Sequence, residues 1–175
     1  MKIHRRTEQV LDKLTDEIPY ESSAGWVGGG YLLMDMLAAI MEDQMDLASL
    51  EVQMRDKCVS NPIIEFLRMA TSWEMRKNPG TYAEVVSGLV STNGSETTQD
   101  AVRSLREYCI STVEAMGEEA DQCELMALSQ CLNAPLEVES VAGKAYNLST
   151  LGDLSGQGAC LLYRAGHYDI LYKAR

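Results

Sequence analysis

The sequence has only two histidines, His4 and His167, and zinc sites usually draw on several histidines and cysteines at short spacings. Its five cysteines are widely spaced and include no Cys-x-x-Cys pair. An odd number of scattered cysteines indicates reduced thiols in an intracellular compartment rather than a disulfide framework. We therefore expect no metal ion and no other cofactor. We expect the protein in the cytoplasm, with the nucleus as an additional location.

Long apolar runs and an excess of basic residues are also missing. No apolar stretch approaches the roughly 18 residues that span a bilayer, and no apolar segment of a signal peptide follows the basic residues 1–6. Asp and Glu number 26 and Lys and Arg 15, so the formal net charge is −11. Phosphate backbones and anionic membranes repel an acidic domain. We expect neither nucleic acid nor a membrane as a partner, whereas a protein with a basic face fits this charge.

Apolar residues make up 46% of the chain, which is enough to build the core of a single domain of 175 residues. In the first two-thirds of the chain these residues recur at helical spacing. Proline, glycine and capping residues set the limits of the predicted helices. We expect helices over residues 7–18, 31–44, 47–54, 61–77, 81–89, 98–116 and 121–133, with a Ser/Gly-rich connector over 21–30 and a polar loop over 91–97.

Local signals define several helix starts. Asp46 is expected to cap the short helix that follows it. Asn61 is expected to cap the next helix, with Pro62 at its first position. Asp121 followed by Glu124 has the spacing of a capping box. Residues 28–30 are three glycines before a helix, but no strand leads into them and no Lys-Ser/Thr follows. We therefore interpret them as a flexible connector and not as a phosphate-binding loop.

The pattern changes at Pro135, where strand-like alternation begins. Residues 136–141 alternate in polarity and predict a strand, whereas residues 143–158 resemble a long loop. Two further strands are expected over 159–164 and 167–173, joined by a tight hairpin turn at Ala165 and Gly166. Helices first and strands last predict an α+β domain. Its helical N-terminal two-thirds is expected to pack on a small, mostly antiparallel C-terminal sheet.

His167 and Asp169 are the candidate catalytic residues. On a strand, residues two apart project from the same face, with Cα atoms about 6.6 Å apart. A carboxylate at that distance can orient an imidazole and stabilise its protonated form, as in the base and orienting acid of a nucleophilic site. Tyr168 projects from the opposite face. From the spacing alone, a solvated pair on a surface strand is the more common explanation.

The segment from Leu161 to Tyr172, which reads LLYRAGHYDILY, resembles the catalytic-histidine strand of the otubain group of ovarian-tumour (OTU) deubiquitinating cysteine proteases. One position departs from that pattern, since Ala165 stands where the family has proline. Residues 63–72, 108–116 and 125–138 are also similar to parts of the family. Residues 45–175 form the best-matching part, and residues 1–44 match weakly.

The resemblance implies a single otubain-like domain over residues 1–175 with an incomplete papain-like OTU fold. It also implies that His167 is the general base and Asp169 the orienting acid of a thiol isopeptidase, which cleaves ubiquitin from lysine through an acyl-enzyme. Ubiquitin or polyubiquitin is then the expected partner. A ubiquitin-conjugating enzyme is a second candidate partner.

The nucleophile expected from the resemblance is missing. The family's cysteine lies in an Asp-Gly-x-Cys segment at a helix N-terminus, where the helix dipole lowers the thiol pKa and backbone N–H groups help form the oxyanion hole. No Asp-Gly pair occurs in these 175 residues. Cys58 is the least unsuitable substitute, because it precedes the predicted helix start at Asn61. The other four cysteines are expected to be core residues.

Two interpretations remain open at this point. The chain is either a truncated or incorrectly predicted product of an active deubiquitinase, or a non-catalytic relative that binds ubiquitin or a ubiquitin-conjugating enzyme. The presence of both His167 and Asp169 favours the first. In either case the chain as it stands is expected to be inactive. We also expect an open groove beside His167 and a marginally stable or self-associating protein, because the family's cysteine helix packs against the sheet.

Overall fold

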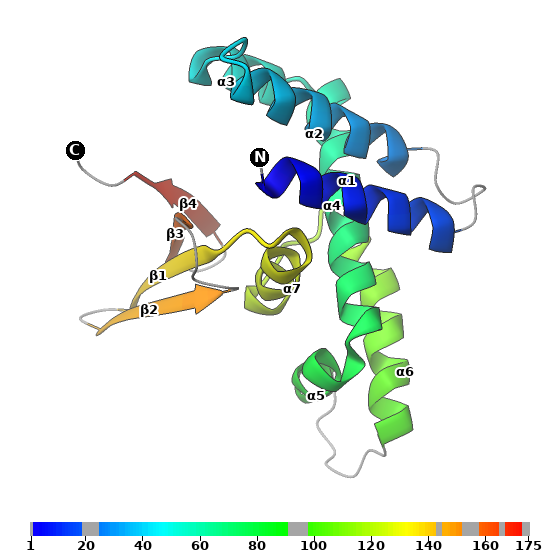
Figure 1. Ribbon diagram of the computed structural model, residues 1–175. Coiled ribbons are helices and arrows are strands. Elements are labelled where there is room, and N and C mark those ends of the chain that lie inside the picture. Colours follow the sequence, from blue (N-terminus) through cyan, green and yellow to red (C-terminus); the bar gives the residue numbers. More distant parts are fainter. Residues whose placement is uncertain are drawn as a thin grey trace.

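The computed structural model describes residues 2–18, 25–90, 98–142, 145–151, 158–164 and 167–172. Helices occupy the first part of the chain and strands the last, so the predicted α+β class is confirmed (Figure 1). Its helices are α1 (Lys2–Glu17), α2 (Trp26–Met41), α3 (Leu47–Arg55), α4 (Lys57–Lys77), α5 (Pro79–Val90), α6 (Thr98–Tyr108), the π-helical turn η2 (Cys109–Val113) and α7 (Gln122–Leu132). Its strands are β1 (Leu136–Ala142), β2 (Ala145–Leu151), β3 (Ala159–Arg164) and β4 (His167–Leu171). Within the described ranges, no helix is both long and apolar enough to cross a membrane.

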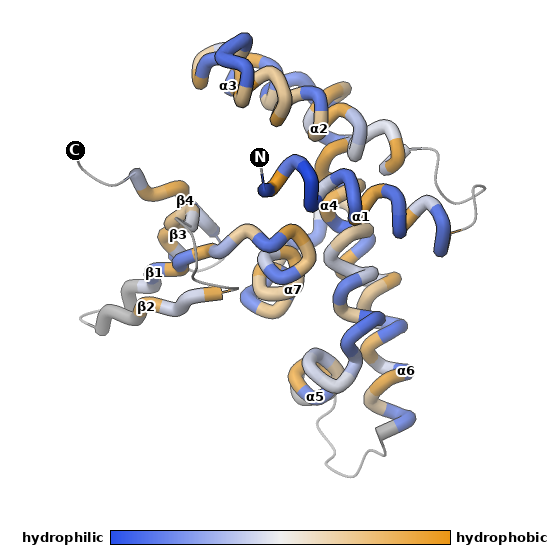
Figure 2. Tube along the Cα trace, in the orientation of Figure 1, coloured by the Kyte–Doolittle hydropathy of each residue, from blue (hydrophilic) through white to orange (hydrophobic). Residues whose placement is uncertain are grey.

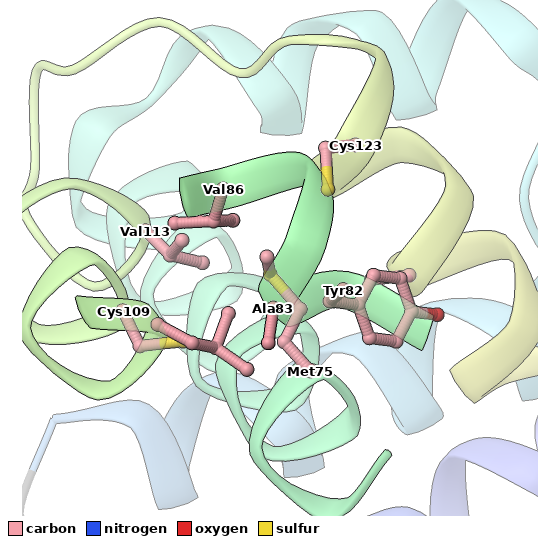
Figure 3. Close-up of a cluster of buried hydrophobic side chains, with 9 residues drawn as sticks. Met75, Tyr82, Ala83, Val86, Cys109, Val113 and Cys123 are labelled. Atoms are coloured by element: carbon pink, nitrogen blue, oxygen red, sulfur yellow. The ribbon is translucent and has the colours of Figure 1, made fainter. Parts of the chain in front are cut away.

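The helical body is organised around α4 and α7, which both contribute to two buried clusters. Phe66 and Ala70 in the middle of α4 pack with residues of α1 and α2 and with the end of α7. Met75, near the end of α4, packs with α5, α6 and the start of α7. Figure 3 shows this second cluster, whose buried members are Met75, Tyr82, Ala83, Val86, Leu105, Cys109, Val113, Cys123 and Ala127. The buried phenol of Tyr82 donates to Gln130 Oε1 at 2.8 Å, so its polar group is satisfied.

The sheet has the strand order β2-β1-β3-β4. Both outer pairs are antiparallel and the central β1–β3 pair is parallel. The predicted mostly antiparallel sheet is therefore confirmed. Figure 1 shows α7 between the sheet and the other helices. Val138 and Leu151 are buried on one face of the sheet. The Ser129 hydroxyl of α7 lies 2.8 Å from the carbonyl oxygen of Ala134 and 3.0 Å from that of Leu151. These contacts fix the sheet to the helical body.

The predicted start of α4 at Asn61 was wrong. The helix begins at Lys57, because Asp56 is its N-cap and accepts a hydrogen bond from the Cys58 N–H at 2.8 Å. Pro62 therefore lies inside the helix, where it removes only the bond to the carbonyl four residues earlier, in the second turn. The cap predicted for α3 is confirmed, since Asp46 Oδ1 accepts from the Ser49 N–H at 2.8 Å. That bond holds the pKa of the Asp46 carboxyl below its ordinary value.

The long helix predicted over residues 98–116 is interrupted. It consists of α6 followed by η2, in which the Glu114 N–H donates to the Cys109 carbonyl at 2.9 Å and widens the last turn. Leu105, Cys109 and Val113 are buried as the helical spacing predicted. Val102 and Met116, which continue the helical spacing of these three residues, are exposed.

The long loop predicted over residues 143–158 was also wrong, because it contains β2. This strand pairs with β1 along its whole length, from Leu136 opposite Leu151 to Ala142 opposite Ala145. Its Asn and Ser residues are weak strand formers, so the pairing with β1 decides its conformation. The turn predicted at Ala165 and Gly166 and the loop predicted over 91–97 lie outside the described residues.

The glycines at 28–30 belong to α2, so their interpretation as a flexible connector was wrong. Gly28 faces open space, whereas a methyl group on Gly29 would collide with the carbonyl oxygen of Pro62. Gly29 therefore allows α2 and α4 to approach closely, and glycine is needed here for its lack of a side chain.

Replacement of two neighbouring glycines tests this close approach. Gly29→Ala is expected to lower the free energy of unfolding by at least ~2 kcal/mol, because the new methyl group forces the α4 backbone away. Gly28→Ala is the matched control. It is expected to raise the free energy of unfolding by up to ~1 kcal/mol, because alanine is the better helix former. Urea denaturation of both variants measures the difference, and equal effects would contradict the packing.

Candidate active site

The antiparallel register of β3 and β4 determines which side chains meet beside His167. Arg164 lies opposite His167 and Leu162 lies opposite Asp169, so these residues share one face of the sheet. Tyr163 and Tyr168 form the intervening pair on the other face, with ring centroids 5.0 Å apart. The prediction that Tyr168 projects away from the histidine is therefore confirmed.

His167 and Asp169 are in contact. His167 Nε2 lies 3.2 Å from Asp169 Oδ1, which is within hydrogen-bonding distance. An ionised carboxylate can only accept hydrogen bonds, so Nε2 carries the proton and Nδ1 is left as the basic atom of the neutral ring. The His167 side chain is 70% exposed, and Nδ1 is therefore accessible to a group arriving from outside the sheet.

Arg164 is a member of this site that the sequence analysis missed. Its Nη2 donates to Asp169 Oδ2, so the carboxylate is held from both sides, by Arg164 and by His167. The Arg164 guanidinium, followed by His167, holds the pKa of the Asp169 carboxyl below its ordinary value. A two-residue turn after Arg164 would have predicted this pair, because it places Arg164 directly opposite His167.

The groove predicted beside His167 is present and has a volume of about 490 Å³. Its walls come from β3, β4, the end of α6 and the segment before α7, and its lining residues are Tyr108, Glu119, Ala120, Asp121, Tyr163, His167 and Tyr168. Tyr163 and Tyr168 line the groove from the sheet face opposite to that of Asp169, so the groove lies on the tyrosine face and His167 borders it at the start of β4. Glu118 and Glu119, in the segment before α7, are both exposed.

A buried carboxylate organises the wall of the groove that faces the sheet. The predicted capping box of α7 is confirmed, since Glu124 Oε2 accepts from the Asp121 N–H at 2.8 Å. Glu124 Oε1 also accepts from the Tyr108 hydroxyl at 2.5 Å. Burial and this hydrogen bond raise the pKa of Tyr108 above its ordinary value. Burial, followed by the charge of Asp121, also raises the pKa of Tyr168.

Arg68 of α4 holds the same wall from behind. Its Nη1 donates to the carbonyl oxygens of Thr112 at 3.2 Å and Val113 at 2.8 Å, and its Nη2 donates to that of Glu118. The segment between η2 and α7, which supplies Glu119 and Asp121 to the groove, is thereby tied to the longest helix of the body.

The cysteines do not bring a thiol to this groove. Three of the five are buried in the helical body, where desolvation raises the pKa of Cys109, of Cys123 to about 11 and of Cys131 to about 12. Cys160 is buried on β3 opposite Leu171 of β4. Leu171 is four residues from His167, so Cys160 lies at least about 13 Å from His167 along the strands. Cys58 is exposed in the first turn of α4. Within the part of the chain that the structure describes, none of the residues lining the groove is a cysteine.

Comparison with known proteins identifies the family. The sequence model for Peptidase C65 Otubain matches residues 31–173. The chain belongs to this family of otubain-type deubiquitinases. The resemblance seen in its C-terminal segment is therefore confirmed.

Relatives in several organisms share this match. Rat (Rattus norvegicus) ubiquitin thioesterase OTUB1 is 29% identical over 143 residues, which cover 80% of this chain and 48% of that protein. The OVARIAN TUMOR DOMAIN-containing deubiquitinating enzyme 1 of Arabidopsis thaliana is 30% identical over 148 residues, which cover 75% of this chain and 45% of that protein. The chain thus spans about half the length of these relatives.

Solved structures share the fold. A complex of ceOTUB1 with ubiquitin aldehyde and UBC13~Ub matches 99% of this chain and 67% of the solved chain, with a TM-score of 0.74 and 20% identity. A complex of h/ceOTUB1 with ubiquitin aldehyde and UBCH5B~Ub matches 98% of this chain and 63% of the solved chain, again with a TM-score of 0.74 and 20% identity. These matches confirm the OTU fold.

Removal of the Arg164 charge tests the electrostatics of the site. Arg164→Gln is expected to raise the pKa of the Asp169 carboxyl toward its ordinary value, because the hydrogen bond from the Arg164 guanidinium, the main cause of the lowered pKa, is lost. A lowered pKa in the folded chain means that the Asp169 charge favours folding above about pH 4, and that this contribution disappears as the pH falls through the lowered pKa. A carbon-13 NMR titration of the carboxyl measures the change. Arg103→Gln, which removes an exposed arginine paired with Glu107, is the control and should leave the Asp169 pKa unchanged.

Proposed function

We propose that the chain carries the acid–base half of an otubain-type thiol isopeptidase site, with His167 as general base and Asp169 as the residue that orients it. The observation that supports this proposal is the 3.2 Å contact between His167 Nε2 and Asp169 Oδ1 beside a groove of about 490 Å³. The chain as it stands is proposed to be inactive, because no thiol lines the groove among the described residues.

The geometry suits one division of labour between the two ring nitrogens. Nε2 donates to Asp169, and Nδ1 accepts the proton of a cysteine thiol that a complete site provides. The thiolate attacks the isopeptide carbonyl, the imidazolium returns its proton to the departing lysine amine, and water then hydrolyses the acyl-enzyme. Asp169 stabilises the imidazolium between the two proton transfers, and Arg164 keeps Asp169 ionised.

We further propose ubiquitin or polyubiquitin as the partner, with a ubiquitin-conjugating enzyme as a second one. The rat relative is a ubiquitin thioesterase and the Arabidopsis relative a deubiquitinating enzyme, and the solved neighbours are complexes with ubiquitin aldehyde and with UBC13~Ub or UBCH5B~Ub. The net charge of −11 and the carboxylates of Glu119 and Asp121 at the groove suit a partner with a basic face.

A second candidate function is a module that binds ubiquitin or a ubiquitin-conjugating enzyme without cleaving a bond. The observation that favours it is the burial and position of the cysteine thiols. Four of the five cysteines are buried, and the exposed one, Cys58, lies in the first turn of α4.

Treatment with ubiquitin that carries a C-terminal electrophile tests the proposal. The 175-residue protein is expected to bind ubiquitin saturably in calorimetry and to form no covalent adduct in mass spectrometry. Glu119→Gln is expected to weaken binding about threefold, because a charge at the groove rim is lost. Glu107→Gln, an exposed carboxylate of α6, is the matched control and should bind as the unmodified chain does.

The outcomes separate the candidates. An adduct with the 175-residue protein would refute the claim that it has no working nucleophile, and failure to bind ubiquitin would refute both candidate functions. If in-frame sequence upstream is available, the same treatment of a longer product distinguishes them. An adduct with the longer product favours the isopeptidase, and binding without an adduct favours the module.

A further inference from the structure

A second pocket, distinct from the groove, lies between the first turns of α1 and the end of α7. It has a volume of about 450 Å³ and shares no lining residue with the groove. Its lining residues are three cations and three side-chain amides, namely Lys2, Arg5, Arg6, Gln9, Gln130 and Asn133. Figure 2 shows the start of α1 as a hydrophilic segment.

The three cations form no ion pair with a described residue, although the protein is rich in acidic residues. Among the residues that the structure describes, no carboxylate lies within 4.0 Å of the charged groups of Lys2, Arg5 or Arg6. The chain carries 26 acidic residues, so carboxylates are common enough to supply ion-pair partners for these cations. The pocket therefore presents uncompensated positive charge.

The placement of these cations also works against α1 itself. Lys2 is three residues from Arg5 and four from Arg6, and like charges at these spacings repel on a helix. An arrangement that costs helix stability points to a role outside folding, and a bound anion would reverse this cost.

Two lining side chains are anchored so that donors remain for a ligand. Arg6 Nε donates to the Cys131 carbonyl at the end of α7 at 2.6 Å, which fixes the guanidinium while its other N–H groups remain as donors. Gln130 Oε1 accepts from the Tyr82 hydroxyl at 2.8 Å, so the Gln130 NH₂ group is the part that can donate to a ligand. The hydrogen bond from Arg6 to Cys131 does not explain why residues 2 and 5 are also basic.

We propose that this pocket binds a phosphate monoester. Two guanidinium groups, an ammonium and neighbouring amide donors match a dianion that has three acceptor oxygens, whereas a carboxylate would neutralise only one of the three cations. The volume of about 450 Å³ holds a phosphate together with part of the group that carries it. Free phosphate and a phosphorylated side chain or small molecule share this chemistry, and the test distinguishes them.

Titration of the 175-residue protein at pH 7.5 and constant ionic strength tests the proposal. Inorganic phosphate is expected to shift the side-chain amide NMR signals of Gln9, Gln130 and Asn133 saturably, whereas chloride is not. The double variant Lys2→Gln/Arg5→Gln is expected to bind phosphate at least about tenfold more weakly. Both residues are exposed, and a thermal melt verifies that the variant folds. Arg103→Gln, which removes an exposed arginine of α6, should bind phosphate as the unmodified chain does.

The second arm compares sources of the phosphate group. A phosphoserine tetrapeptide is expected to bind more tightly than inorganic phosphate, and the unphosphorylated peptide is expected not to bind. No saturable shift with any phosphate, or equal affinity in the double variant, would overturn the site. Binding of phosphoserine no tighter than that of inorganic phosphate would overturn its assignment to a monoester.

Discussion

The register between β3 and β4 is the constraint on which the candidate site depends. Because side chains alternate along a strand, a slip of one residue would move His167 and Asp169 to the face that carries Tyr163 and Tyr168. Both faces of the hairpin resist such a slip. The tyrosine pair packs at 5.0 Å on one face, and Asp169 is held by His167 and Arg164 on the other. The site is thus a property of the pairing and not of the histidine alone.

The hairpin acts in the context of α7, which joins the sheet to the helical body. One side of α7 contributes Cys123, Ala127, Cys131 and Leu132 to the two buried clusters. The same helix supplies Ser129 to the strand end at Leu151 and the capping box that shapes the groove. Glu124 is a buried carboxylate that accepts two hydrogen bonds, and an unpaired charge at this position would be costly. The groove beside His167 is therefore built from one strand pair, the end of α6 and the segment before α7, and the strands are far from the other two in the sequence.

Local signals in the sequence predicted the elements that they control directly. The Asp121/Glu124 box, the Asp46 cap and the alternation of His167 and Asp169 each depend on a few adjacent residues, and each is present in the structure. The failures required information about pairing and packing between elements. β2 is a strand because it pairs with β1. Gly29 lies in a helix, where its lack of a side chain lets α2 approach Pro62 closely. The link from Arg164 to Asp169 follows from the pairing of β3 with β4, which only two residues separate, and not from the spacing of residues along β4 alone.

The central claim is that His167 is an oriented base, with Nε2 held by Asp169 and Nδ1 left to accept a proton. Nitrogen-15 NMR of the neutral imidazole tests it most directly, because the two tautomers have distinct shifts. The account predicts a single Nε2–H tautomer for His167 and a mixture of tautomers in the Asp169→Ala variant. A proton on Nδ1, or the same tautomer distribution in both proteins, would contradict it.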